Sequence, residues 1–264
     1  MKLESAFAKV EAYLSERDTR PGILARQLVG KERPGDPKLA DLLVNERRAR
    51  TRMDGSIDGS LVRTSWAAWE MMDLGADPLH GGLDRLVSWI LAQVEAGTAT
   101  DPAPLVLPNG AAIADPEGAA FAARCLGLRV VLRARREERP AIQQLVDQLA
   151  NGPQPPTLDL SACALAALAL VPPPHRRHLD GLVHRLGRAQ GGDGAWADAD
   201  LFHMLEALVL AGIRPARQVV ARAAPALVRR LRDDGAFDDP PHDHPIHEER
   251  ALIGLRALAI ALEE

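Results

Sequence analysis

The chain has 264 residues, of which 47% are apolar, and a formal net charge of −4. Its length allows a sizeable buried core, its richness in alanine, leucine and arginine favours helices, and its slightly acidic balance gives no electrostatic reason to expect nucleic-acid binding. No run of about 18 uncharged apolar residues occurs, so we expect no membrane-spanning segment, although a peripheral membrane contact stays open.

Helices are predicted along the whole chain, separated by proline and glycine clusters, with no competing strand-like alternation. The expected helices cover residues 3–16, 23–29, 38–51, 61–74, 83–96, 118–132, 140–150, 160–170, 178–189, 201–212, 216–231 and 246–262. The first of them is charged throughout, unlike a secretory signal. Cys125 and Cys163 fall in apolar helical stretches without metal-ligand spacing, so we expect reduced, buried cysteines in a cytoplasmic protein.

The segment 190–196, Gln-Gly-Gly-Asp-Gly-Ala-Trp, is the most distinctive local motif. Asp193-Gly194 is expected to make a tight turn, because glycine tolerates a positive φ. Trp196 is a large apolar side chain that should fix the turn against a neighbouring helix. Weaker copies of the motif stand at residues 234–237, 54–57 and 109–110.

The helices also repeat in pairs, with a period of roughly 40 to 50 residues, which is typical of a repeat architecture. A polar residue recurs near the start of one apolar helix in each unit, and these residues are Arg63, Asp115, Asp159, Asp200 and His247. Aspartate is favoured at a helix N-terminus for structural reasons alone, so a capping role is the alternative to a functional one. We expect all five at the same end of the molecule.

These units resemble the repeats of the terpenoid cyclase and protein prenyltransferase superfamily, whose Gln-x-x-Asp-Gly-x-Trp elements join outer to inner helices. The resemblance implies an all-α fold, an α/α toroid of about five to six helical hairpins. It would form a single domain over residues 1–264, with 1–37 as a helical extension and 38–264 as the repeats. Inner-helix ends surround a deep central cavity in that superfamily, so an apolar, isoprenoid-like small molecule is the expected ligand, cyclised or transferred there.

Two chemistries follow from the resemblance. Residues 157–162, Thr-Leu-Asp-Leu-Ser-Ala, are similar to the Asp-x-Asp-Asp-Thr-Ala element of squalene-hopene-type cyclases, which implies that Asp159 is a general acid. Both flanking acids of that element are replaced here, and a helix-terminus role for Asp159 is the alternative.

The second chemistry is a metal site of the protein prenyltransferase type. Asp200 and His247 stand where that family has zinc ligands, whereas its cysteine would fall on Phe202. Zn²⁺ takes about four ligands, so His203, His244 or Glu249 would have to complete the shell. Residues 238, 239 and 243 also weakly resemble an Asp-Asp-x-x-x-Asp magnesium motif, so either Zn²⁺ or Mg²⁺ is conceivable. The alternative is a proline- and histidine-rich loop that binds no metal.

The candidate site residues form three groups. The catalytic candidates are Asp159 and Asp200, the substrate-binding candidates are Arg63, Trp66, Trp69, Asp115, Phe202 and His203, and the metal candidates are Asp200, His244 and His247. The competing hypothesis is a non-catalytic toroid that acts as a small-molecule-binding or protein-interaction scaffold. An aromatic-lined cavity with Asp159 facing into it would favour the enzyme, and a centre filled by side chains would favour the scaffold.

Overall fold

The computed structural model describes residues 2–98, 101–172, 178–237 and 244–264. These residues form twelve helices and one two-stranded sheet, which confirms the all-α class. The elements are α1 (Leu3–Ser15), α2 (Arg20–Leu28), α3 (Asp36–Ala49), α4 (Leu61–Asp73), α5 (Gly81–Ala96), β1 (Leu105–Val106), β2 (Ala112–Ile113), α6 (Pro116–Arg133), α7 (Pro140–Asn151), α8 (Leu158–Leu168), α9 (Leu179–Ala189), α10 (Leu201–Ala211), α11 (Arg214–Arg230) and α12 (His244–Glu263).

Prolines account for most differences from the expected helix boundaries. Pro21 and Pro37 were interpreted as breaks, but each lies in the first turn of a helix, so α2 and α3 begin earlier than predicted. A proline is tolerated there because the first-turn N–H groups have no partner within the helix. Thr19 helps to fix the start of α2, because its side chain accepts a hydrogen bond from the Gly22 amide. The two short strands were not predicted at all.

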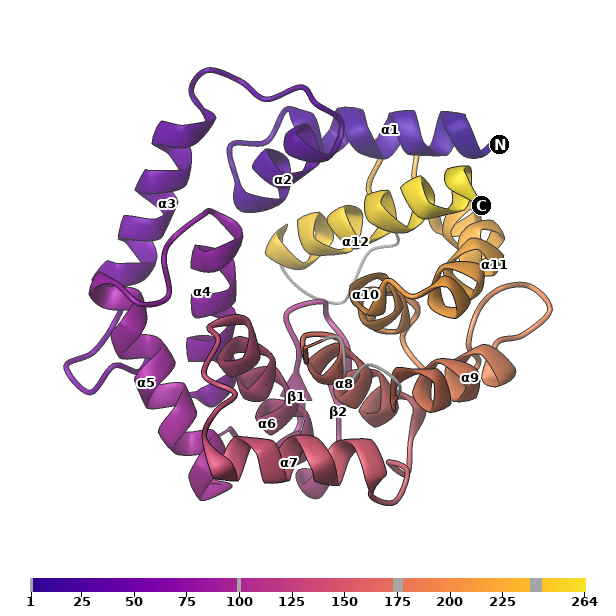
Figure 1. Ribbon diagram of the computed structural model, residues 1–264. Coiled ribbons are helices and arrows are strands. Elements are labelled where there is room, and N and C mark those ends of the chain that lie inside the picture. The colour runs from indigo at the N-terminus through magenta and orange to yellow at the C-terminus, as the bar shows by residue number, and fades with distance from the viewer. Residues whose placement is uncertain (1, 99–100, 173–177, 238–243) are drawn as a thin grey trace.

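The even-numbered helices form a closed circuit of contacts. α4, α6, α8, α10 and α12 each contact the next, and α2 contacts both α12 and α4 (Figure 1). The odd-numbered helices lie outside them, with α1 against α12, α5 against α4 and α6, and α11 against α10 and α12. This order of contacts is the one that an α/α toroid would have. The stretch expected as an extension, residues 1–37, contributes α2 to this circuit.

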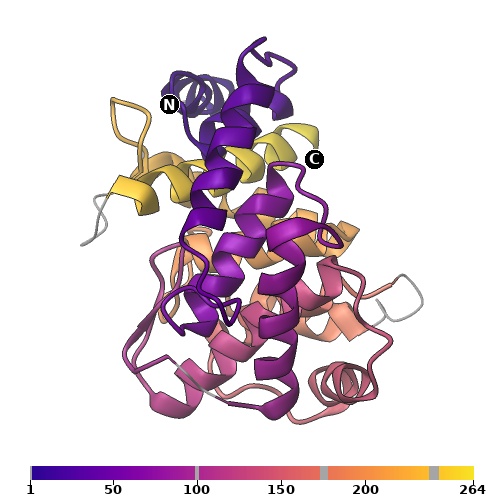
Figure 2. The same cartoon turned by 90° about the vertical axis from the view of Figure 1, so that its left-hand side faces the viewer.

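A buried ion pair holds the N-terminal helices together. The Arg26 side chain is 1% exposed, and its Nε donates to Asp36 Oδ2 at 2.9 Å. Its Nη1 donates to the carbonyls of Ser15 and Arg17 at 3.0 and 2.9 Å. The hydrogen bonds from Arg26 lower the pKa of Asp36. The end of α1, the last turn of α2 and the start of α3 are thereby fixed to one guanidinium group, and α1 lies beside α12 (Figure 2).

The motif at 190–196 forms the expected turn, and the same turn occurs four times. Its Asx side chain accepts from the backbone N–H two residues later, and the glycine between them has a φ of +86° to +92°. The four pairs are Asp54-Gly55, Asn109-Gly110, Asp193-Gly194 and Asp234-Gly235. As predicted, the two aromatic residues that follow these turns are buried: Trp196 is 4% exposed and Phe237 is 1% exposed. The Trp196 indole also donates to the Leu186 carbonyl at 2.8 Å.

Gly194 provides a test of why the turn needs glycine. Its φ is +88°, and an added Cβ would lie 2.3 Å from the Arg222 carbonyl oxygen on α11. We expect Gly194→Ala to lower the free energy of unfolding by more than about 2 kcal/mol. The alanine would be strained at this positive φ, and its Cβ would clash with the Arg222 carbonyl oxygen. Urea denaturation measures this change.

Gly192 is the matched control, two residues away in the same turn. An added Cβ there has nothing within 4 Å. Gly192→Ala should therefore change the free energy of unfolding by no more than about 0.5 kcal/mol. Equal effects of the two substitutions would show that the turn does not depend on the Gly194 contact.

Candidate functional site

Paired charges occupy the middle of the circuit of inner helices. Arg20 of α2 forms ion pairs with Asp73 of α4 and Glu249 of α12, and it is only 4% exposed. Arg133 of α6 lies 2.6 Å from Asp73 on the other side. Burial would raise the pKa of Asp73, but Arg20 and Arg133 outweigh burial and lower it. Burial does raise the pKa of Glu249, despite its contact with Arg20.

A second pair crosses the centre from α6 to α10. Arg129 Nη1 lies 2.6 Å from Glu206 Oε1, and both side chains are largely buried. The Trp69 ring is covered by guanidinium groups, with Arg129 at 3.8 Å and Arg133 at 4.2 Å from its centroid. Trp69, a candidate for contact with substrate, is only 5% exposed and is packed in this charged core.

The β1–β2 hairpin brings a further polar side chain to the same place. Its tip lies near the centre of Figure 1, and the Asn109 side chain at that tip donates to Glu206 Oε2 at 2.8 Å. Arg250 of α12 donates to the Asn109 carbonyl at 2.9 Å. The other three turns place their glycines against the outer helices α5, α11 and α1, whereas Gly110 packs on Ile246 and Arg250 of α12. The hairpin therefore closes off part of the space between the inner helices.

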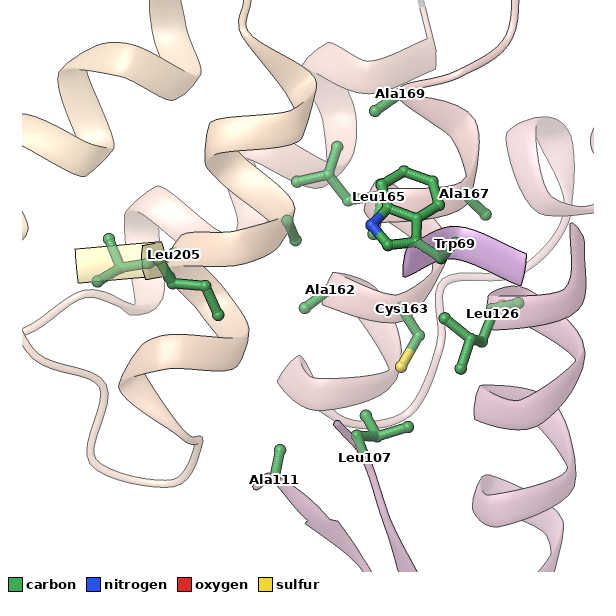
Figure 3. Packing of buried hydrophobic residues seen from close by; sticks show 14 of the residues in the cluster. Trp69, Leu107, Ala111, Leu126, Ala162, Cys163, Leu165, Ala167, Ala169 and Leu205 are labelled. Atoms are coloured by element: carbon green, nitrogen blue, oxygen red, sulfur yellow. The ribbon is translucent and has the colours of Figure 1, made fainter. Parts of the chain in front are cut away.

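A thiol and an imidazole meet beneath the hairpin. Cys163 Sγ lies 3.4 Å from His203 Nε2, and both residues line a cavity of about 30 Å³, enough for roughly one water molecule. Leu107 of the hairpin and Leu126 of α6 lie close to Cys163 (Figure 3). Burial raises the pKa of the Cys163 thiol, so the thiol is protonated at neutral pH.

The hydrogen bonds of His203 oppose a thiolate–imidazolium pair. Asn109 Oδ1 accepts from the Ala111 amide, which turns the Asn109 N–H groups toward Glu206 and toward His203 Nδ1 at 3.0 Å. Nδ1 therefore accepts, and Nε2 donates to the Asp159 carbonyl at 3.0 Å. Burial would lower the pKa of His203, but Cys163 and Glu206 outweigh burial and raise it to about 9. The contribution of Cys163 requires a thiolate, whereas this thiol is protonated, and a proton on Nδ1 would face the Asn109 N–H. We assign a neutral imidazole that holds the hairpin in place.

The charge of Glu206 is expected to contribute to the free energy of unfolding. Arg129 lowers the pKa of Glu206 from its ordinary value of 4.5, and this outweighs the effect of burial. A carboxylate with a lowered pKa stabilises the fold above its unfolded pKa, and the contribution is lost as the pH falls through the folded pKa. We expect Glu206→Gln to cost about 3 kcal/mol at pH 7, because Arg129 is left buried without its counterion.

The difference from wild type should shrink in urea unfolding as the pH falls below about 4.5, the ordinary pKa of a glutamate, and Glu206 takes up a proton. The exposed Glu138→Gln is the control and should change little at any pH. A Glu206→Gln deficit that stays constant over this pH range would exclude the carboxylate charge as its cause.

Trp66 of α4 lies between this cluster and the surface of the protein. The half-buried indole lines the small central cavity, a cavity of about 250 Å³ bounded by α2, α3, α4 and α12, and an open cavity of about 700 Å³ outside it. Arg47 and Glu70, paired at 2.7 Å, line both larger cavities. Arg20 lies over the Trp66 ring at 4.8 Å. We call the three spaces around this indole the Trp66 cleft.

The five aligned polar residues lie as predicted at the starts of inner helices. Asp115 and Asp200 are the N-cap residues of α6 and α10, and Arg63, Asp159 and His247 lie in the first turns of α4, α8 and α12. Asp115 accepts from the Gly118 amide at 2.6 Å, which is an ordinary capping interaction. Arg63 is exposed, pairs with Asp58 at 2.8 Å and lines the outer part of the Trp66 cleft.

Asp159 and Asp200 come close together. The Asp200 amide donates to Asp159 Oδ1 at 3.4 Å, and burial raises the pKa of Asp159. Both carboxylate oxygens of Asp200 are used, one by the amides of Phe202 and His203 and the other by Arg250 at 2.8 Å. Phe202 is completely buried, with its ring 5.1 Å from that of Phe237 in an edge-on contact. His203 alone of these neighbours lines the small central cavity.

The metal prediction stays a prediction. Within the ranges that the structure describes, no three or more histidine, cysteine or acidic residues are grouped so as to hold a metal ion. Residues 238–243 and the side chain of His244 lie outside the described part of the chain. The occupied oxygens of Asp200 mean that a metal there would have to displace Arg250 or the N-cap bonds.

Comparisons with known proteins identify no relative: no family model, curated protein or solved structure matches this chain. The terpenoid cyclase resemblance therefore stays a prediction. Across the described residues, none of the helices has both the length and the apolar character needed to cross a membrane.

Proposed function

We propose that this protein binds an apolar small molecule, up to an isoprenoid in size, in the Trp66 cleft, and that it does so as a binding protein. The observation that carries the proposal is the position of Trp66, which lines three cavities of about 30, 250 and 700 Å³. A half-exposed tryptophan at the junction of such spaces offers a flat apolar surface for stacking.

The rest of the cleft fits a ligand with an apolar body and one polar end. Leu43, Leu74 and Pro108 supply apolar walls in the inner part, whereas Arg50 and Arg63 lie at the open end. The Arg20 side chain also lines the inner part, but its Nε is shut off from solvent and lies 3.8 Å from Glu70 Oε1, so the polar end of the ligand is placed toward Arg50 and Arg63.

The side chains that fill the space between the inner helices favour a binding protein over an enzyme. The ion pairs of Arg20 and Arg129 occupy the middle of the circuit, and the innermost cavity is only about 30 Å³. A carbocation cyclisation calls for a large space walled by aromatic faces. The filled centre supports the scaffold alternative, with the ligand at the side of the circuit.

Trp66→Ala tests the proposal directly. Titrating farnesol and farnesyl diphosphate against the protein by calorimetry, we expect saturable binding that weakens about tenfold in the variant, because the stacking surface is lost. The control is Trp89→Ala, which removes another half-buried tryptophan, on α5. Unchanged affinity in Trp66→Ala, or no binding of either probe to the folded wild type, would contradict the proposal.

Asp159 is the basis of a second candidate function, acid-catalysed isoprenoid cyclisation. The observation in its favour is the half-buried carboxyl whose pKa is raised by burial, as a proton donor requires. If this function is present, Asp159→Asn should reduce turnover of an isoprenoid alkene, followed by gas chromatography of the products, by at least 100-fold. Turnover that survives in a folded Asp159→Asn protein would leave Asp159 as a helix-terminus residue.

A further inference from the structure

Another cavity lies between α6, α7 and the connection to α8. It has a volume of about 340 Å³. Phe121, Leu145 and Leu149 form its sides, and Pro153, Pro155 and Pro156 form one edge. α7 packs mainly on α8 and α5, which leaves this space between it and α6. We call it the α6–α7 groove.

The base of the groove is apolar. Cys125 lines both the groove and the small central cavity, so its side chain is part of the wall between them. Burial raises the pKa of this thiol to about 12. The thiol is therefore neutral at physiological pH and acts as a small apolar group.

One cation, Arg124, stands in this largely apolar lining. Arg124 is half-buried, and its Nε donates to the Val94 carbonyl at 3.2 Å. Among the described residues it has no carboxylate partner, unlike Arg20, Arg129 and Arg133, each of which is paired. A partly desolvated guanidinium with its terminal nitrogens unpaired favours an anionic ligand group.

We propose that the α6–α7 groove binds a medium-chain fatty carboxylate, with the alkyl chain against Phe121, Leu145 and Leu149 and the carboxylate on Arg124. A largely apolar groove with a single cation and two neutral amides, Gln148 and Gln154, matches an unbranched chain with one anionic end. The volume falls at the lower end of the range of small-molecule sites. The site is separate from the Trp66 cleft and does not depend on the function proposed for that cleft.

Chain length and head group test the two halves of the proposal separately. Each buried methylene should strengthen binding by roughly fourfold, so decanoate should bind on the order of tenfold tighter than octanoate in calorimetric titration. Decanoate should also bind more tightly than decanol. Arg124→Gln should weaken decanoate by about tenfold, because a charge-assisted hydrogen bond is lost, and should leave decanol unchanged.

Two controls locate the site. Arg188→Gln removes an exposed arginine on α9, and Trp66→Ala alters the other cleft; both should leave decanoate binding intact. Leu149→Gln should weaken decanoate and decanol alike. The proposal is overturned if decanoate fails to bind the folded protein saturably, if Arg124→Gln binds it as wild type does, or if light scattering shows a second copy of the chain covering the groove.

Discussion

Charges removed from water must be paired, and this requirement governs the centre of the protein. Arg20, Asp73 and Glu249 come from three different helices, and Arg129 and Glu206 come from two more. An isolated charge in this place would cost several kcal/mol, so α2, α4, α6, α10 and α12 are held in the one arrangement that satisfies all of them. Apolar packing alone would tolerate small rotations and shifts of these helices, whereas guanidinium–carboxylate pairs do not.

This core also decides where a ligand can go. In an open toroid the axis is the natural binding place, but here the axis is filled by paired side chains and by the tip of the hairpin. Space is left beside the axis, where Trp66 meets α2 and α3, and in the wall, where α7 stands off from α6. Both proposed sites are thus consequences of a filled centre, and neither needs the axis to open.

The sequence predicted the repeated features well and the singular ones poorly. The helices and the Asp193-Gly194 turn could be identified because apolar periodicity and an Asx-Gly pair are local signals. The alignment of Arg63, Asp159 and His247 near inner-helix starts also followed from the repeat. Asn109-Gly110 was recognised as a turn, but no local signal distinguishes a turn that packs on an outer helix from one that enters the centre.

The candidate site shows the same division. Trp66 and Trp69 were both named as candidates for contact with substrate. Trp66 lines the cleft, whereas Trp69, three residues later, lies in the charged core. Arg20, Arg129 and Glu206 were not selected, because a charged residue in a helical stretch ordinarily faces solvent and its partner comes from a distant part of the chain. Arg124 could not be identified from the sequence either, because what distinguishes it is the lack of a carboxylate partner among the described residues, and a sequence does not show which arginines are paired.

The contacts of α12 with α1 and α2 have a consequence for synthesis of the chain. α1 and α2 leave the ribosome before α12, which carries Glu249, the acidic partner of Arg20. Until then the circuit has a gap, and the buried faces of α1 and α2, including Ala6, Val10 and Leu14, have no permanent cover. Contacts so far apart in sequence form late, because the intervening chain must first be ordered. The growing polypeptide therefore passes through a stage in which the faces of α1 and α2 that α12 later covers are exposed or only transiently shielded.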